Sequence, residues 1–258
     1  MLIDTHAHLN FEAFQEDWQE VAQRALDGGV VSIINVGSNL ETSKKAVAIA
    51  GKNMFAAVGL HPIHVGEERF PKVVFNELAK NKKVVAIGET GIDLFRNVGT
   101  LAKQKEVFLK SIALANDRKL PVIVHCRNAK EEVRALLQNN MPSYGAVLHC
   151  FSEDWSFAQQ LLKLGLYISF TAHITLNNIS PATLEALKNI PLSRIMIETD
   201  SPYILPRKQK NKKIKRNEPL FVSEVAHKIA QVKNISFEQV AQQTTKNAIG
   251  FFGLRNRS

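Results

Sequence analysis

Short apolar runs rich in β-branched residues alternate with longer amphipathic stretches along this chain. The short runs have the length and composition of buried strands, and the amphipathic stretches are long enough for helices. We predict strands at residues 2–4, 30–36, 54–58, 84–87, 121–124, 146–148, 166–170 and 195–197. Between them we predict helices at residues 17–27, 42–50, 72–80, 101–119, 130–139, 155–164 and 181–188.

The strict alternation of strand and helix predicts an α/β fold with a parallel sheet. Eight such units in a chain of 258 residues are typical of a (β/α)8 TIM barrel, whereas an open doubly wound sheet more often has fewer strands. Two further helices, at 218–232 and 237–252, follow the eighth strand. Because no linker, repeat or shift of composition divides the chain, we expect a single barrel domain over residues 1–258.

Composition points to a globular protein that can bury a large core, since 45% of the residues are hydrophobic. We find neither a membrane-spanning segment nor a signal peptide in the sequence, which predicts a cytoplasmic protein without a membrane partner. Nothing in the sequence indicates an obligatory protein partner. The two cysteines, Cys126 and Cys150, fit a reducing compartment, and we expect both to be buried as small apolar residues.

The formal net charge of +9 is concentrated in one stretch. Residues 207–216 contain seven Lys or Arg residues and no acidic residue. Such a run usually is a solvated, mobile segment, and the alternative is a contact with nucleic acid.

Metal-ligand residue types follow six of the eight predicted strands. The first strand ends at His6 and His8, which alternation places on the same face. The later groups are His61 after the third strand, Glu89 after the fourth, His125 after the fifth, His149 after the sixth, and Glu198 to Asp200 after the eighth. The carboxyl ends of barrel strands form one rim, so these side chains should converge there.

Imidazole and carboxylate ligands without paired thiolates favour a hydrolytic site for Zn²⁺, Mn²⁺ or Mg²⁺ over a structural zinc site. The six predicted ligands exceed what one ion with an open position needs, so we expect two divalent ions; the ligands are His6, His8, Glu89, His125, His149 and Asp200. Glu89 is the best placed to bridge the ions. His64 and His173 lie in loops near the same rim.

Seven short segments carry a resemblance to a known family. They are DTHAHLNF from Asp4, VGLHP from Val58, IGETGID from Ile87, PVIVHCRNA from Pro121, LHCFS from Leu148, ETDSPY from Glu198 and NEP from Asn217. In this order and spacing they resemble the TatD family of metal-dependent deoxyribonucleases, of the amidohydrolase superfamily. The resemblance implies a DNA nuclease, often described as a 3′ to 5′ exonuclease. It also implies that His6, His8, Glu89 and Asp200 hold one ion, and Glu89, His125 and His149 the other.

For catalysis we expect Asp200 to act as a general base and His61 to contact the scissile phosphate or protonate the leaving oxygen, with Glu89 bridging the ions. The expected partner is DNA, as a single strand or at an end. The basic stretch lies on the catalytic rim, so we name as candidate substrate contacts His64, Arg127, Lys212, Lys213, Lys215 and Arg216.

Two other classes of function remain open. The same ligand set can polarise a carbonyl, as in an amidohydrolase or esterase, including one that cleaves the ester of an aminoacyl-tRNA. A nucleic-acid-binding protein without catalysis could also retain these ligands for stability.

Overall fold

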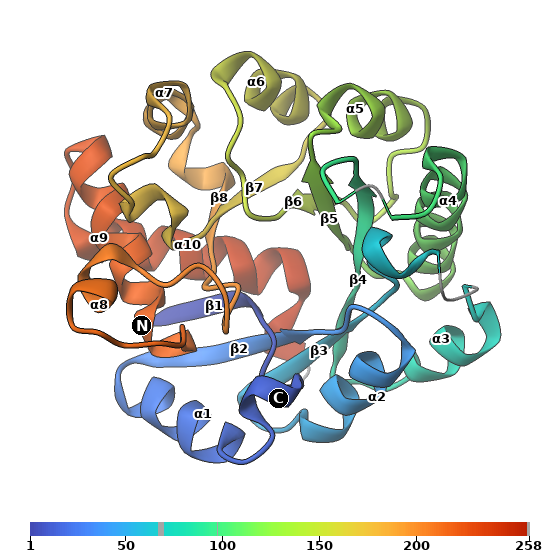
Figure 1. Cartoon of the computed structure of the whole chain (residues 1–258), viewed down its shortest axis with the longest axis horizontal. Helices are drawn as coiled ribbons and strands as arrows, with labels where there is room; N and C mark the ends of the chain where they lie inside the picture. The colour runs from blue at the N-terminus through green and yellow to red at the C-terminus, as the bar shows by residue number, and fades with distance from the viewer. Residues whose placement is uncertain (67–69, 97, 257–258) are drawn as a thin grey trace.

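Eight parallel strands in sequential order form the centre of the molecule (Figure 1). The structure is a computed structural model that describes residues 1–66, 70–96 and 98–256. The strands are β1 (Leu2–Ala7), β2 (Val30–Val36), β3 (Met54–Val58), β4 (Val84–Asp93), β5 (Val122–Arg127), β6 (Ala146–Leu148), β7 (Tyr167–Phe170) and β8 (Ile195–Ile197). A parallel bridge between Ala7 and Ser201 joins the two edges of the sheet. The (β/α)8 barrel predicted from the sequence is therefore confirmed.

Helices surround the strands and bury their apolar faces against them (Figure 1). They are α1 (Trp18–Asp27), α2 (Leu40–Ile49), α3 (Lys72–Leu78), α4 (Leu101–Arg118), α5 (Lys130–Asn139), α6 (Trp155–Lys163), α7 (Pro181–Asn189), α8 (Arg207–Asn211), α9 (Val222–Lys233) and α10 (Phe237–Phe252). The short helix α8 lies inside the basic stretch and was not predicted. Among the described residues, we find no helix long and apolar enough to span a membrane.

The inside of the barrel is a packed apolar core toward the amino ends of the strands. Ile34, Phe55, Ile123 and Met196 belong to one buried cluster, and they alternate along their strands with residues that pack against the helices. Phe252 of α10 joins this cluster. Apolar side chains fill the barrel at the amino ends of its strands, and the polar side chains lie at the carboxyl ends.

Side-chain hydrogen bonds help to close the barrel where β8 meets β1. The Thr199 hydroxyl donates to Asp4 Oδ2 over 2.6 Å, and the Thr5 hydroxyl donates to the Ile197 carbonyl over 3.0 Å. The Asp200 backbone N–H donates to the His6 carbonyl over 2.8 Å. Burial raises the pKa of Asp4 to about 8, in spite of the hydrogen bonds from Thr199. These hydrogen bonds place Asp200, which follows the last strand, beside His6 of the first strand.

Strand β4 continues to Asp93, well past residue 87, where we predicted its end. The polar residues of this segment do not end the strand, because the strand packs tightly against β5 and its buried carboxylates find partners there. Gly91 has a φ of 148°, and a β-carbon on it would lie 2.0 Å from the carbonyl oxygen of His125. A glycine at this position therefore sets the distance between the strands that carry Glu89 and His125.

This close approach can be tested with two glycine to alanine variants. Gly165 also has a positive φ, 86°, but a β-carbon on it would meet no atom within 4 Å. We expect Gly165→Ala to cost only about 1–2 kcal/mol, from the left-handed backbone. Gly91→Ala should cost several-fold more, because the added carbon displaces the backbone of β5, as measured by denaturant unfolding. Equal losses of stability for the two variants would contradict the close-approach argument.

Candidate metal centre

The buried carboxylate of Glu89 lies among four imidazole rings. Its Oε1 is 2.7 Å from His125 Nδ1, 2.8 Å from His149 Nε2 and 3.2 Å from His61 Nε2. Its Oε2 is 3.3 Å from His6 Nε2. The two oxygens of one carboxylate therefore face different groups of histidines.

A second group lies on the Oε2 side of Glu89. His6 Nε2 and His8 Nε2 are 3.2 Å apart, and Asp200 Oδ1 lies 3.3 Å from His8 Nε2 and 3.7 Å from His6 Nε2. Asp200 has a left-handed backbone with a φ of 54°, where the chain turns after β8. The side chains from the two ends of the barrel sequence thus share one cluster.

The outer nitrogens of three rings are held by acceptors. His8 Nδ1 donates to the Val36 carbonyl over 2.8 Å. His149 Nδ1 donates over 3.1 Å to Glu198 Oε1, and His125 Nε2 donates over 3.2 Å to Asp93 Oδ2.

A neutral imidazole that donates from its outer nitrogen has a lone pair on the inner one, which is the arrangement that metal-binding histidines show. When the three rings are neutral, as in a metal-bound site, their inner nitrogens therefore present lone pairs to the cluster. Lone pairs of His125 and His149 facing a carboxylate oxygen below 3 Å need a cation between them.

The pKa values show how strongly these groups interact. Burial alone raises the pKa of Glu89, but the nearby His149, His61 and His125 rings hold it well below its ordinary value. Burial alone lowers the pKa of His149, whereas the carboxylates of Glu89 and Glu198 raise it well above its ordinary value. The site binds positive charge, which protons or metal ions can supply.

The donor set fits a divalent metal ion. The ligand atoms of His6, His8 and Glu89 lie within 4.8 Å of one another. The spacing of 3.2–3.3 Å between the inner atoms matches neighbouring ligands at about 2.1 Å from one ion. Nitrogen and carboxylate ligands of this kind suit Zn²⁺ or Mn²⁺ and, with more oxygen, Mg²⁺.

His61 differs from the other rings in its hydrogen bonding. Its Nδ1 accepts from the Ile63 backbone N–H over 3.1 Å, so the proton of the neutral ring lies on Nε2 and points into the cluster. Burial lowers its pKa to about 4, which keeps the ring neutral. His61 is thus a hydrogen-bond donor to the site, and its lone pair is already used.

The predicted substrate contacts lie in different surroundings. His64 follows His61 in the 3-10 helix η2 (Pro62–His64) and is half-buried. Lys212, Lys213 and Lys215 are exposed after α8. Arg127 is exposed, and its guanidinium carbon lies 3.9 Å from the centroid of the Phe95 ring.

Arg216 is held in place by other parts of the protein. It forms ion pairs with Asp17 at 2.6 Å and with Glu218 at 3.3 Å, and it lies over the Phe14 ring. These interactions fix the end of the basic stretch against the segment that precedes α1. Arg216 therefore has a structural role at the end of the basic stretch, and its contact with substrate stays a prediction.

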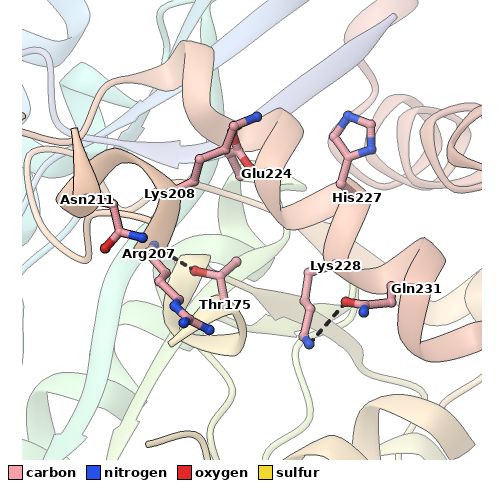
Figure 2. A pocket seen from close by; sticks show the side chains of 8 residues that line it. All are labelled: Thr175, Arg207, Lys208, Asn211, Glu224, His227, Lys228 and Gln231. Atoms are coloured by element: carbon pink, nitrogen blue, oxygen red, sulfur yellow. Dashed lines mark hydrogen bonds and ion pairs between the residues drawn. The ribbon is translucent and has the colours of Figure 1, made fainter. Parts of the chain in front are cut away.

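A basic pocket of about 580 Å³ lies between α8 and α9 (Figure 2). Arg207, Lys208, His227 and Lys228 line it, and Lys208 pairs with Glu224 at 3.4 Å. None of the predicted metal ligands lines this pocket. It extends the positive surface of the basic stretch toward α9.

Both cysteines are only partly buried, which corrects the prediction that both are buried. Cys126 packs against the main apolar core, whereas Cys150 Sγ lies 3.6 Å from the Thr171 hydroxyl. Burial raises the pKa of each thiol to about 12. Neither is a thiolate near neutral pH.

Asp93 and Glu198 orient the rings; sequence reasoning missed Asp93 and named Glu198 only as part of the group after the eighth strand. Asp93 accepts from the Arg96 and Phe95 backbone N–H groups. Its hydrogen bonds with His125 and with the Arg96 N–H lower its pKa to about 2 against the effect of burial. Glu198 also accepts from the Cys150 backbone N–H over 2.8 Å. Both residues lie in quoted motifs, IGETGID and ETDSPY, and their acidic character next to the predicted ligands was the available signal.

Comparisons with known proteins give consistent matches over nearly the whole chain. The family model described as TatD related DNase matches residues 3–253. The chain is 38% identical to the uncharacterized metal-dependent hydrolase YabD of Bacillus subtilis, covering 98% of this chain and 99% of that protein. It is 34% identical to the 3′-5′ ssDNA/RNA exonuclease TatD of Klebsiella pneumoniae, covering 98% of each. The crystal structure of YjjV, a TatD homolog from Escherichia coli, superposes with a TM-score of 0.91 at 26% identity and 98% coverage of both chains.

The orienting role of Glu198 predicts an effect on metal affinity. Glu198→Ala removes the acceptor for His149 Nδ1–H and should weaken metal binding about 10- to 100-fold. Glu198→Gln keeps an oxygen at this position and should weaken it much less. Titration with Zn²⁺ against a chelating dye measures both variants, and an unchanged affinity in Glu198→Ala would show that Glu198 does not orient the ligand.

Proposed function

This chain belongs to the family of TatD-related DNases, and from that premise we propose that it hydrolyses phosphodiester bonds of single-stranded nucleic acid from an end. The observation that carries the proposal is the convergence of inner lone pairs on Glu89, which makes a cage for divalent cations. Metal dependence is also the property named for the similar hydrolase of Bacillus subtilis.

We further propose that the cage would hold two ions, with Glu89 as a ligand of both. The division of its oxygens supports this, because Oε2 faces His6 while Oε1 faces His125 and His149. His6, His8 and Asp200 would complete one side. His125 would bind through Nδ1, since Asp93 occupies its Nε2.

When bound, two divalent ions would supply the Lewis acidity that activates a water molecule and neutralises charge on the phosphoryl group. Asp200 is suited to receive the proton from that water. Burial alone raises its pKa, but the hydrogen bond with His8 and the charges of the other histidines lower the pKa below its ordinary value. The carboxylate is therefore ionised at neutral pH and can accept a proton.

His61 would contribute a hydrogen bond to the phosphoryl group. The hydrogen bond from Ile63 leaves the only proton of the neutral ring on Nε2. Giving up that proton would form an imidazolate, which is unfavourable. Of the two roles expected from the sequence, contact with the scissile phosphate is therefore the one that the geometry supports.

The substrate class follows from the charge of the rim. The exposed Lys212, Lys213 and Lys215 lie on the segment that follows β8, at the same end of the barrel as the metal centre. Cations at this position favour a polyanion over a small neutral substrate. The similar protein of Klebsiella pneumoniae is named a 3′-5′ ssDNA/RNA exonuclease. We therefore propose a single strand as the substrate of this chain and its 3′ end as the site of attack.

The metal and base roles predict loss of activity in two variants. Glu89→Ala and Asp200→Asn should each reduce Mg²⁺- or Mn²⁺-dependent release of nucleotides from single-stranded DNA by about 10²–10⁴-fold. Glu20→Ala, at an exposed position on α1, is the control and should retain activity. Full activity in both site variants would refute the assignment.

A panel of single-stranded RNA, charged tRNA and carboxylic esters in the same assay separates the competing functions. Turnover of charged tRNA without turnover of DNA or RNA would favour the esterase. Metal-dependent binding without any turnover would favour the binding protein.

Neutralisation of phosphates by the basic stretch should appear in the salt dependence of binding. Replacing Lys212, Lys213 and Lys215 with Gln should flatten the slope of log affinity against log salt by about 0.7 for each phosphate of a single strand that the variant no longer neutralises. The control replaces Lys52, Lys163 and Lys188, exposed residues that precede β3, β7 and β8 at the opposite end of the barrel. An equal change of slope in both triple variants would show that the basic stretch does not contact the nucleic acid.

A further inference from the structure

The ring of Phe95 is exposed at the rim of the barrel next to the metal centre. Its exposed fraction is 59%, larger than that of the other exposed aromatic residues, Tyr203 at 53% and Tyr144 at 45%. It lies two residues after Asp93, at the carboxyl end of β4, which is the end that carries Glu89. Single exposed apolar residues are common, so the exposure acquires meaning only from its surroundings.

One face of this ring is covered by a cation. The Arg127 guanidinium carbon lies 3.9 Å from the ring centroid. Arg127 ends β5, two residues after His125, so its side chain leaves the strand on the same side as that ring. Arg127 takes part in none of the ion pairs among the described residues, so its charge is available to bind an anion.

Hydrogen bonds fix the position of this pair relative to the metal centre. The backbone N–H of Phe95 donates to Asp93 Oδ1 over 3.0 Å, while Asp93 Oδ2 accepts from His125 Nε2 over 3.2 Å. The backbone N–H of Leu94 donates to the carbonyl of Arg127 over 3.0 Å. The same carboxylate therefore positions both His125 and the start of the segment that presents Phe95.

We propose that Phe95 and Arg127 form a nucleobase-stacking subsite, which rests on the proposed nuclease function. The base of a nucleotide adjoining the scissile phosphate stacks on the Phe95 ring. The Arg127 guanidinium holds that ring in place and lies within reach of the phosphate of the same nucleotide. Aromatic rings bind bases of any sequence in this way. A base inside a duplex has both faces covered by its neighbours and must leave the stack to bind here, so the subsite favours unpaired strands.

The test measures each protein variant on two substrates, so that the effects of the two changes can be compared. The variants are Phe95→Ala and Phe95→Trp, with Tyr144→Ala as the control, because Tyr144 is an exposed aromatic residue that precedes β6 at the opposite end of the barrel. The substrates are a single-stranded oligonucleotide and the same strand with abasic sites at its last two 3′ positions. Metal content and the unfolding midpoint are measured for every variant to confirm that the centre is intact.

Phe95→Ala should raise KM for the normal strand by about tenfold, within the range that loss of one base stack produces, while Phe95→Trp and Tyr144→Ala stay near wild type. On the abasic strand, wild type and Phe95→Ala should become equal. A normal KM for Phe95→Ala, or the same rise in KM on both strands, would overturn the subsite. Wild-type protein that hydrolyses neither strand would instead overturn the proposed function.

A second measurement reads stacking without turnover. In the Asp200→Asn background, a strand with 2-aminopurine at its 3′ end should show weaker fluorescence on binding, and Phe95→Ala should abolish that quenching. Binding of the strand with unchanged fluorescence in the Phe95-containing protein would also overturn the subsite.

Discussion

The buried carboxylate of Glu89 is the constraint on which the arrangement of this site depends. A lone carboxylate at this depth would be strongly unfavourable, and burial by itself raises its pKa. Four imidazole rings compensate for that cost, from β1, from β5, and from the loops after β3 and β6. Each ring reaches Glu89 only because the barrel brings its strands to one rim. The barrel fold is therefore what allows the buried charge of Glu89 to be balanced.

The backbone is adapted to this convergence at two places. Around β4 and β5, Gly91 permits an approach that any β-carbon would prevent. Where β8 meets β1, Asp4 and Thr5 bind the segment that leads to Asp200. These residues lie outside the cage, yet they set the distances between its donors. Substitutions there should affect metal binding through geometry, without removal of any ligand.

Much of this arrangement could be predicted from the sequence, since alternating strands and helices indicated a barrel and the barrel indicated a common rim for His6, Glu89 and His149. The pattern could not show where β4 ends, because Glu89 and Asp93 continue the strand only when partners from neighbouring strands satisfy them. Nor could it show which nitrogen of a ring faces inward. That choice depends on acceptors such as Glu198, which meets His149 only in three dimensions. The ion pairs of Arg216 and the stacking of Arg127 on Phe95 are likewise tertiary interactions that a charge pattern does not contain.

The central proposal is that Glu89 would contribute its two oxygens to two ions in one cage. Electron paramagnetic resonance of the protein loaded with Mn²⁺ tests this most directly, because ions that share a carboxylate, about 3.5–4 Å apart, interact magnetically. We expect two Mn²⁺ ions per chain with the broad spectrum of a coupled pair. A single ion per chain, or two ions with the six-line spectrum of isolated Mn²⁺, would contradict the account.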